Sequence, residues 1–156
     1  MFVGVSHTAI CVSDMEQSIA FYRDILGMRI VSDVLLEGPR VDKIEGIRGM
    51  KARSVRLALD EGGEIQLIQH FNHKGKPAAV NLQQYDIGIV HICFTVKNIN
   101  EIYNRLREKG VVLNCTVQEN PFKFRSFSFK DPDEVELEVM EFMTGYDGRA
   151  VLKTKD

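Results

Sequence analysis

Two stretches of this chain repeat one another at a distance of 84 residues. GVSHTAICVSDMEQSIAFYRDILG begins at Gly4, and GIVHICFTVKNINEIYNRLREKG begins at Gly88. The alignment matches His7 with His91, and it also aligns the two amphipathic segments that follow these histidines. Internal similarity of this kind is typical of a duplicated supersecondary unit. We therefore expect the chain to contain two copies of one structural module.

Each copy opens with alternation of the strand type. In the first copy one face of the expected strand carries Val3, Val5, His7, Ala9 and Cys11. The alignment gives the second copy the same pattern, so that both repeat-related histidines are predicted to lie on strands.

A helix and three further strands follow in each half. Asp14 and Asn98 are the expected N-caps of the two helices, and Gly27 and Gly110 the expected stops. The strand-like runs are MRIVSDVLL, SVRLALD and EIQLIQH in the first half, and VVLNCTV, FRSFSF and VELEVMEF in the second. Each half is thus predicted to be βαβββ, and the fold class α+β.

Matching the last strands of the two halves places Gln66 opposite Glu138. The two spacings differ, because 59 residues separate His7 from Gln66 and 47 separate His91 from Glu138. The segment 37–50, EGPRVDKIEGIRGM, accounts for the excess as a long turn-rich insertion, with 118–123 as its shorter counterpart. A loop of this length is usually functional, which favours a lid or a substrate-contacting segment over a solvated connector.

Four polar side chains at matched repeat positions predict a metal site. A single strand histidine is more often a partly buried side chain with an ordinary hydrogen-bond partner than a ligand. Repetition reverses that expectation, because His7 and His91 are matched by Gln66 and Glu138 on terminal strands that would otherwise favour apolar inward residues. We interpret the four as ligands of one divalent cation.

Length and charge restrict the class of protein. The 156 residues, 44% of them hydrophobic and 27% charged, suit a soluble body built as one domain. Its expected parts are module 1 at about 3–70, a linker at about 71–87, module 2 at about 88–142 and a tail at 143–156. The formal net charge of −2 and the absence of a long Lys/Arg run argue against a nucleic-acid partner.

Other sequence signals concern the location of the protein and its thiols. No stretch approaches the ~18 apolar residues that span a bilayer, and no signal peptide is evident, so we expect no membrane partner and a cytoplasmic location. The three cysteines, Cys11, Cys93 and Cys115, form no C-x-x-C spacing and are expected to be reduced and largely buried.

These residues resemble the vicinal oxygen chelate superfamily, which includes glyoxalase I, methylmalonyl-CoA epimerase, extradiol dioxygenases and the bleomycin and fosfomycin resistance proteins. The resemblance covers about residues 3–142. Its pieces are HTAICVSD at His7, FYRDILG at Phe21, EIQL at Glu64, VHICFTV at Val90 and KDPDEVELE at Lys130. It implies two tandem βαβββ modules whose curved mixed sheets form a cup, with metal ligands from the first and last strand of each module.

Carried over position by position, the resemblance implies the ligand set His7, Gln66, His91 and Glu138. Two imidazoles, an amide oxygen and one carboxylate suit a divalent metal ion such as Co, Ni, Zn, Mn or Fe. One carboxylate leaves a 2+ ion with a net charge of +1 and hence a stronger Lewis acid, which favours proton abstraction beside a carbonyl.

A base must accompany that metal. Glu138 is the first candidate, because a carboxylate ligand can release the ion and take a proton. The resemblance also implies a second glutamate, which epimerases of the superfamily use on the segment leading into the third strand, in an E-x-G-V context. This chain reads RGMKARSV there, and Glu45 is the nearest carboxylate and the second candidate.

Several functions stay open at this point. The first is a metal-dependent isomerase or lyase of a small carbonyl or acyl-thioester substrate, epimerase-like or glyoxalase-like. The alternatives are an Fe(II)-dependent ring-cleaving dioxygenase with His7, His91 and Glu138 as a facial triad, and a non-catalytic ligand- or antibiotic-binding resistance protein. The resemblance also implies a small-molecule substrate and a homodimer, and leaves open whether the site forms within one chain or between chains.

A group of arginines accompanies the insertion and the third strand. They are Arg40, Arg48, Arg53 and Arg56. They are interpreted either as a solvated charged face or as groups that bind an anion such as a carboxylate or phosphate.

Overall fold

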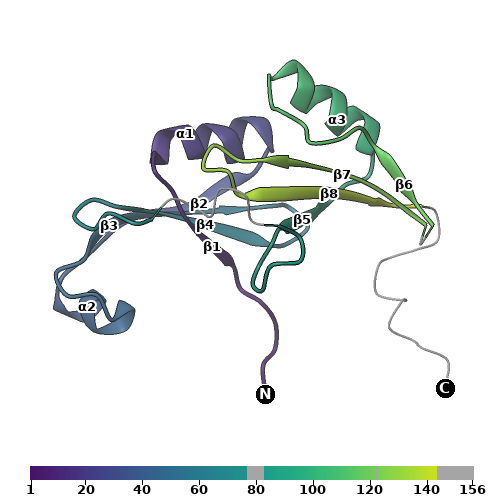
Figure 1. The fold of residues 1–156 in the computed structure, drawn as a ribbon. Coiled ribbons are helices and arrows are strands. Elements are labelled where there is room, and N and C mark those ends of the chain that lie inside the picture. Colours follow the sequence, from purple (N-terminus) through teal and green to yellow (C-terminus); the bar gives the residue numbers. More distant parts are fainter. Residues whose placement is uncertain (77–82, 122, 144–156) are drawn as a thin grey trace. The chain divides into compact units, whose positions relative to one another are not determined.

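The structure is a computed structural model, and it describes residues 1–76, 83–121 and 123–143. The chain divides into two compact units, Met1–Ala78 and Ala79–Asp156. Each unit contains a four-stranded sheet, and Figure 1 shows helical structure packed with the strands of each unit. Residues 77–82 of the expected linker and 144–156 of the expected tail lie outside the described residues.

The described residues of the first unit form seven elements. They are β1 (Thr8–Cys11), α1 (Met15–Ile19), η1 (Ala20–Ile25), β2 (Arg29–Glu37), α2 (Pro39–Glu45), β3 (Lys51–Ala58) and β4 (Glu64–His70). The strand order is β1-β4-β3-β2, with β1 parallel to β4 and the other pairs antiparallel.

The second unit repeats this topology. Its elements are β5 (Ile92–Thr95), α3 (Ile99–Glu108), β6 (Gln118–Asn120), β7 (Phe124–Lys130) and β8 (Glu136–Phe142). The order β5-β8-β7-β6, with β5 parallel to β8, corresponds strand by strand to the first unit. The predicted α+β class and the duplication are confirmed.

The predicted helix boundaries are confirmed at both ends. Asp14 accepts a hydrogen bond from the backbone N–H of Gln17 at 3.0 Å, which satisfies one of the free donors of the first helical turn. Asn98 caps α3 in the same manner. Gly27 and Gly110 have φ of 82° and 78°, a left-handed conformation that glycine adopts without strain.

The first helix differs from the expected regular helix in its second half. Residues Ala20–Ile25 form the π-helical segment η1, in which the Leu26 N–H donates to the Phe21 carbonyl five residues earlier. Phe21 and Tyr22 are both buried and make an edge-to-face contact with their ring centroids 5.3 Å apart. A wider turn lets two consecutive aromatic side chains reach the core, which the 3.6-residue period does not anticipate.

The strand predicted from VVLNCTV, residues 111–117, is wrong. Within this segment Leu113 makes an isolated bridge to Phe129, and the paired edge strand is β6, in the stretch expected to be a loop. The Val111 N–H donates to the Leu106 carbonyl at 3.0 Å and so completes the end of α3 instead of joining the sheet. The valines favoured a strand in this segment. The backbone N–H of Val111 instead makes a hydrogen bond at the end of α3, so it does not pair with a neighbouring strand.

The insertion at 37–50 is also more regular than expected. β2 continues to Glu37, and α2 occupies Pro39–Glu45, where the sequence predicted a turn-rich loop. Pro39 stands in the first turn of this helix, where a missing N–H has no cost. Both oxygens of Asp42 accept backbone N–H groups, from Gly49 at 2.6 Å and Met50 at 3.0 Å. The loop after α2 is therefore tied to the helix.

Alternation along the strands separates two faces of each sheet. In the first unit the face that packs under α1 carries buried Val55, Leu57, Ile65 and Leu67. In the second unit Tyr103 of α3 contacts Phe127, with ring centroids 5.2 Å apart, so buried Phe127, Phe129, Leu137 and Val139 face α3. Each unit thus has its own core on the helix-covered face.

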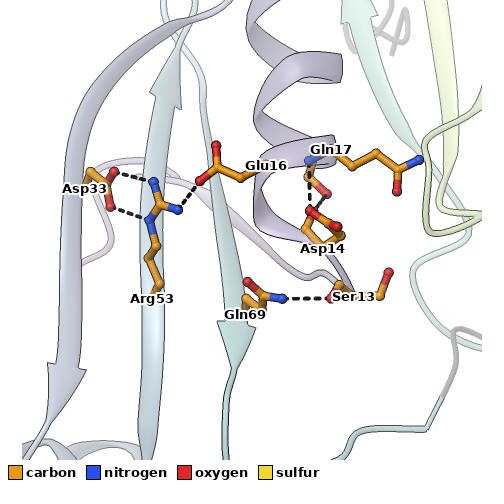
Figure 2. A network of polar contacts seen from close by, with 8 residues as sticks. Ser13, Asp14, Glu16, Gln17, Asp33, Arg53 and Gln69 are labelled. Carbon is orange, nitrogen blue, oxygen red and sulfur yellow. Dashed lines mark hydrogen bonds and ion pairs between the residues drawn. The ribbon is translucent and has the colours of Figure 1, made fainter.

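An ion-pair network fastens α1 to this sheet (Figure 2). Arg53 of β3 donates two hydrogen bonds to Asp33 of β2, at 2.9 and 2.7 Å, and one to Glu16 of α1 at 2.5 Å. Gln69 of β4 donates to the Ser13 carbonyl at 2.8 Å, next to the cap of the helix. The guanidinium therefore joins two strands and a helix, and the hydrogen bond from Arg53 lowers the pKa of the Asp33 carboxyl.

Replacing Arg53 by Met should lower the free energy of unfolding by about 1 kcal/mol at pH 7, because water screens these partly exposed pairs. Asp33 has a depressed pKa in the folded state, so its contribution is present above the unfolded value of ~3.9 and is lost as pH falls through the folded pKa. Urea unfolding of both proteins at pH 7 and near pH 2.5 measures this. An equal difference at the two pH values would contradict the assignment.

Candidate metal centre

The first predicted donor pair lies on one face of the first sheet. Ala9 of β1 pairs with Gln66 of β4, and residues in register share a face. His7 stands two residues before Ala9 and belongs to the same face, opposite the one covered by α1. The histidine directly precedes β1 instead of lying on it.

A buried hydroxyl orients the Gln66 amide. Its Nε2 donates to the Oγ of Ser54 on β3 at 2.8 Å, and Ser54 is 3% exposed. With the nitrogen engaged, the amide oxygen is the side-chain atom that can bind a cation. An amide oxygen is a suitable donor for a hard or borderline ion.

The second donor pair occupies the equivalent position of the second sheet. Cys93 of β5 pairs with Glu138 of β8, as Ala9 pairs with Gln66, and Cys93 stands 84 residues after Ala9. His91 directly precedes β5, so here too the histidine lies just before the strand on which it was predicted. The register confirms the repeat equivalence of Gln66 and Glu138.

His91 and Glu138 face one another closely. The Nε2 of the imidazole lies 3.4 Å from Oε2 of the carboxylate, and the side chains are 35% and 22% exposed. Donors about 2.0–2.2 Å from one ion, in neighbouring coordination positions, stand roughly 3 Å apart. An imidazole nitrogen and a carboxylate oxygen at this separation fit two neighbouring positions on one divalent cation.

The cysteines differ from expectation. All three are free thiols, as predicted, but Cys11, Cys93 and Cys115 are exposed and not buried. Alternation places Cys11 and Cys93 on the faces opposite the helices, away from the cores. Although the residue as a whole is exposed, partial loss of hydration at the sulfur and the neighbouring Glu138 carboxylate raise the pKa of the Cys93 thiol to about 12. This side chain is therefore neutral beside the candidate ligand.

Two acidic residues near the first pair have different surroundings. Glu45, the second candidate acid, is exposed at the last position of α2. Glu64, which the sequence reasoning missed, lies on the same face as Gln66 and has a buried carboxylate oxygen that accepts no hydrogen bond. Glu64 stands two residues before Gln66, so strand alternation places both side chains on one face. This spacing could have identified Glu64 from the sequence.

Each unit contributes two of the four predicted ligands. Within residues 1–76, 83–121 and 123–143, no three His, Cys, Asp or Glu side chains are grouped so as to hold a metal ion. The meeting of the two donor pairs at one ion stays a prediction. Across the same described part of the chain, none of the helices has the length and apolar character needed to cross a membrane.

Two mixed four-stranded sheets of the same topology, each accompanied by helical structure, define a glyoxalase-like α+β fold. The profile described as "Glyoxalase/Bleomycin resistance protein/Dioxygenase superfamily" matches residues 4–139. The chain belongs to this superfamily, and the resemblance to vicinal oxygen chelate proteins is confirmed.

Relatives with assigned names are similar over most of this chain. The lactoylglutathione lyase of Schizosaccharomyces pombe is 27% identical over 146 residues, which is 87% of this chain and 46% of that protein. This chain thus spans about half the length of that relative. The lactoylglutathione lyase of Salmonella typhimurium is 29% identical over 140 residues, with 86% and 90% covered.

Solved structures share the fold. A glyoxalase family protein from Bacillus cereus superposes with a TM-score of 0.82 at 17% identity, covering 92% of this chain and 96% of the other. The fosfomycin resistance protein FosX from Listeria monocytogenes, solved with Mn(II) and sulfate, gives a TM-score of 0.62 at 18% identity, with 92% and 96% covered. At these identities the likeness concerns the fold.

Proposed function

We propose that this protein is a metal-dependent lyase or isomerase that moves a proton on a carbon beside a carbonyl group. His7, Gln66, His91 and Glu138 hold the ion. The observation that carries the proposal is the equivalent register of the two donor pairs, Gln66 beside Ala9 and Glu138 beside Cys93. The Mn(II) in FosX is consistent with a divalent metal in proteins of this fold.

A bound divalent ion supplies a Lewis acid for a substrate carbonyl oxygen. Glu138 is the one carboxylate in the proposed ligand set, since Gln66 is neutral. Its oxygen takes the proton from the neighbouring carbon and returns it to the product, which is general acid–base catalysis. Cys93, neutral beside it, adds no competing charge. Glu45 of α2 is the proposed second acid.

The proposed substrate is a thiol adduct of a 2-oxoaldehyde, which isomerises to a 2-hydroxyacyl thioester. The two lactoylglutathione lyases support this class, and the Salmonella enzyme does so along 90% of its own length. The epimerisation of a 2-methyl acyl thioester is the neighbouring reaction, because it needs the same proton abstraction. We also propose that the protein forms a homodimer and is located in the cytoplasm.

Metal reloading followed by two proton-transfer assays tests the function. Chelator-treated protein should regain close to one ion per site with Co, Ni, Zn, Mn or Fe(II), measured by elemental analysis. The reloaded protein should form thioester from the thiol adduct, or incorporate solvent deuterium into a 2-methyl acyl thioester. A metal content near zero after reloading would overturn the metal site. Oxygen uptake with catechols by iron-loaded protein, without proton exchange, would instead assign a dioxygenase.

A further inference from the structure

Arg56 lies beside the first donor pair. It is the register partner of Gln66 across β3 and β4, so its side chain belongs to the same face as His7 and Gln66. Its Nη2 contacts the Nδ1 of His7 and lies 3.5 Å from the Oγ of Ser6. A permanent cation thus touches a proposed metal ligand.

This contact determines which imidazole nitrogen carries the proton. A guanidinium has five N–H donors and no acceptor, and it stays protonated at any pH that the protein experiences. Nδ1 of His7 must therefore offer its lone pair, and the ring proton resides on Nε2. That proton blocks Nε2 for a cation. Metal binding through Nε2 requires the ring proton to move to Nδ1, and since an N–H cannot accept from a guanidinium, Arg56 must then release Nδ1.

Glu64 offers Arg56 a second partner. The Oε2 of Glu64 is buried and accepts no hydrogen bond, and it lies 3.6 Å from Nη1 of Arg56. A buried carboxylate oxygen without a donor is unfavourable. A small displacement of the guanidinium away from His7 and toward Glu64 would form a charge-assisted hydrogen bond there.

The second unit lacks an arginine at the corresponding place. Ser128 is the register partner of Glu138, where the first unit has Arg56 opposite Gln66. Glu136, which corresponds to Glu64, accepts a hydrogen bond from the Asn114 amide at 2.8 Å. The acid of the second unit is thus satisfied by a neutral donor, and the charged arrangement belongs to the first unit.

We propose that Arg56 competes with the metal ion for His7, and that metal binding transfers the guanidinium from His7 to Glu64. Arg56 is a positioning residue in this scheme, since it sets the metal affinity through His7 and Glu64. The inference rests on the proposed function, because it takes His7 as a ligand.

Affinity for Co²⁺ of the full chain, measured by competition with a chromophoric chelator, tests the scheme. Arg56→Met should bind the ion about 10-fold more tightly, because a charge-assisted hydrogen bond and a nearby positive charge are removed. Glu64→Gln should bind about 3- to 10-fold more weakly, because the released guanidinium loses its charged acceptor. Arg53→Met, on the same strand but the opposite face, should change the affinity less than 2-fold.

The double variant Arg56→Met/Glu64→Gln separates this scheme from simpler effects. Its affinity should equal that of Arg56→Met within about 2-fold, because Glu64 acts only through Arg56. If the changes in affinity of the two single variants were additive in the double variant, each residue would act on the ion through its own charge alone, and the proposal would be overturned. A weakening by Glu64→Gln that persists without Arg56 would make Glu64 a ligand and overturn it as well.

Two further outcomes keep this inference distinct from the proposed function. In metal-free protein, nitrogen-detected NMR should find the His7 proton on Nε2, and a proton on Nδ1 would contradict the scheme. If the unmodified chain binds no Co²⁺, the proposed function fails. If it binds Co²⁺ and Arg56→Met binds no more tightly, only the role of Arg56 fails.

Discussion

Replacing Glu138 by Gln should lower kcat by about 10²- to 10⁴-fold, because an amide cannot take a proton from carbon. The side chain keeps its size, and Gln66 occupies the equivalent register position in the first unit, so the strand pairing should persist. Circular dichroism and thermal unfolding verify the fold. Steady-state kinetics on metal-saturated protein measure the loss.

Glu136→Gln is the matched control for this prediction. Glu136 lies two residues earlier on β8, on the same face, and accepts its hydrogen bond from Asn114. This variant should keep kcat within a few-fold of the unmodified chain. If metal-saturated Glu138→Gln also stayed within a few-fold, Glu138 would not be the base, and Glu45 would become the first residue to replace.

Replacing His91 by Ala should weaken metal binding by about 100-fold or more. Removal of a hydrogen-bond partner of a ligand already costs 10- to 100-fold in many sites, and loss of the ligand itself should exceed that. The imidazole lies 3.4 Å from the Glu138 carboxylate, so its removal leaves the carboxylate as the remaining donor of the second unit. Chelator competition gives the affinity, and elemental analysis gives the bound ion.

Thermal unfolding provides an independent measure of the same change. A metal that binds the folded state raises the unfolding temperature, and the rise grows with the logarithm of the ratio of metal concentration to Kd. The rise seen with the unmodified chain should shrink strongly in His91→Ala. His73→Ala is the control, because His73 is exposed and outside the proposed ligand set. Equal metal stabilisation in all three proteins would exclude His91 from the ligands.

The duplicated topology was predictable because repeat matching needs no knowledge of packing. Once Gly4 is aligned with Gly88, the elements of one half predict those of the other, and the caps Asp14 and Asn98 act through their nearest backbone donors. The equivalence of Gln66 and Glu138 followed from the same alignment, and the strand registers confirm it.

The departures arise where tertiary contacts override local preference. The π-helical turn at Ala20–Ile25 serves the burial of Phe21 and Tyr22, which periodicity cannot show. The end of α3 uses the N–H of Val111, and the expected strand is displaced to Gln118–Asn120. Cysteine burial was predicted from the average behaviour of the residue, whereas alternation placed two of the thiols away from the core.

The contact between Arg56 and His7 was beyond prediction for a different reason. The two residues stand 49 positions apart, and their meeting depends on the parallel alignment of β1 with β4. The arginines around the insertion were open to two interpretations from sequence. In the structure, Arg53 and Arg56 face opposite sides of one strand and have different partners.

The parallel pairing of β1 with β4, and of β5 with β8, has a consequence for how each unit assembles. The first strand of each unit pairs with its last, so each donor pair forms only when distant parts of the chain meet, a step with a high loop-closure entropy. A nascent or partly folded unit therefore exposes its imidazole and its amide or carboxylate separately. Each pair can therefore be complete only after the first and last strands of its own unit have joined.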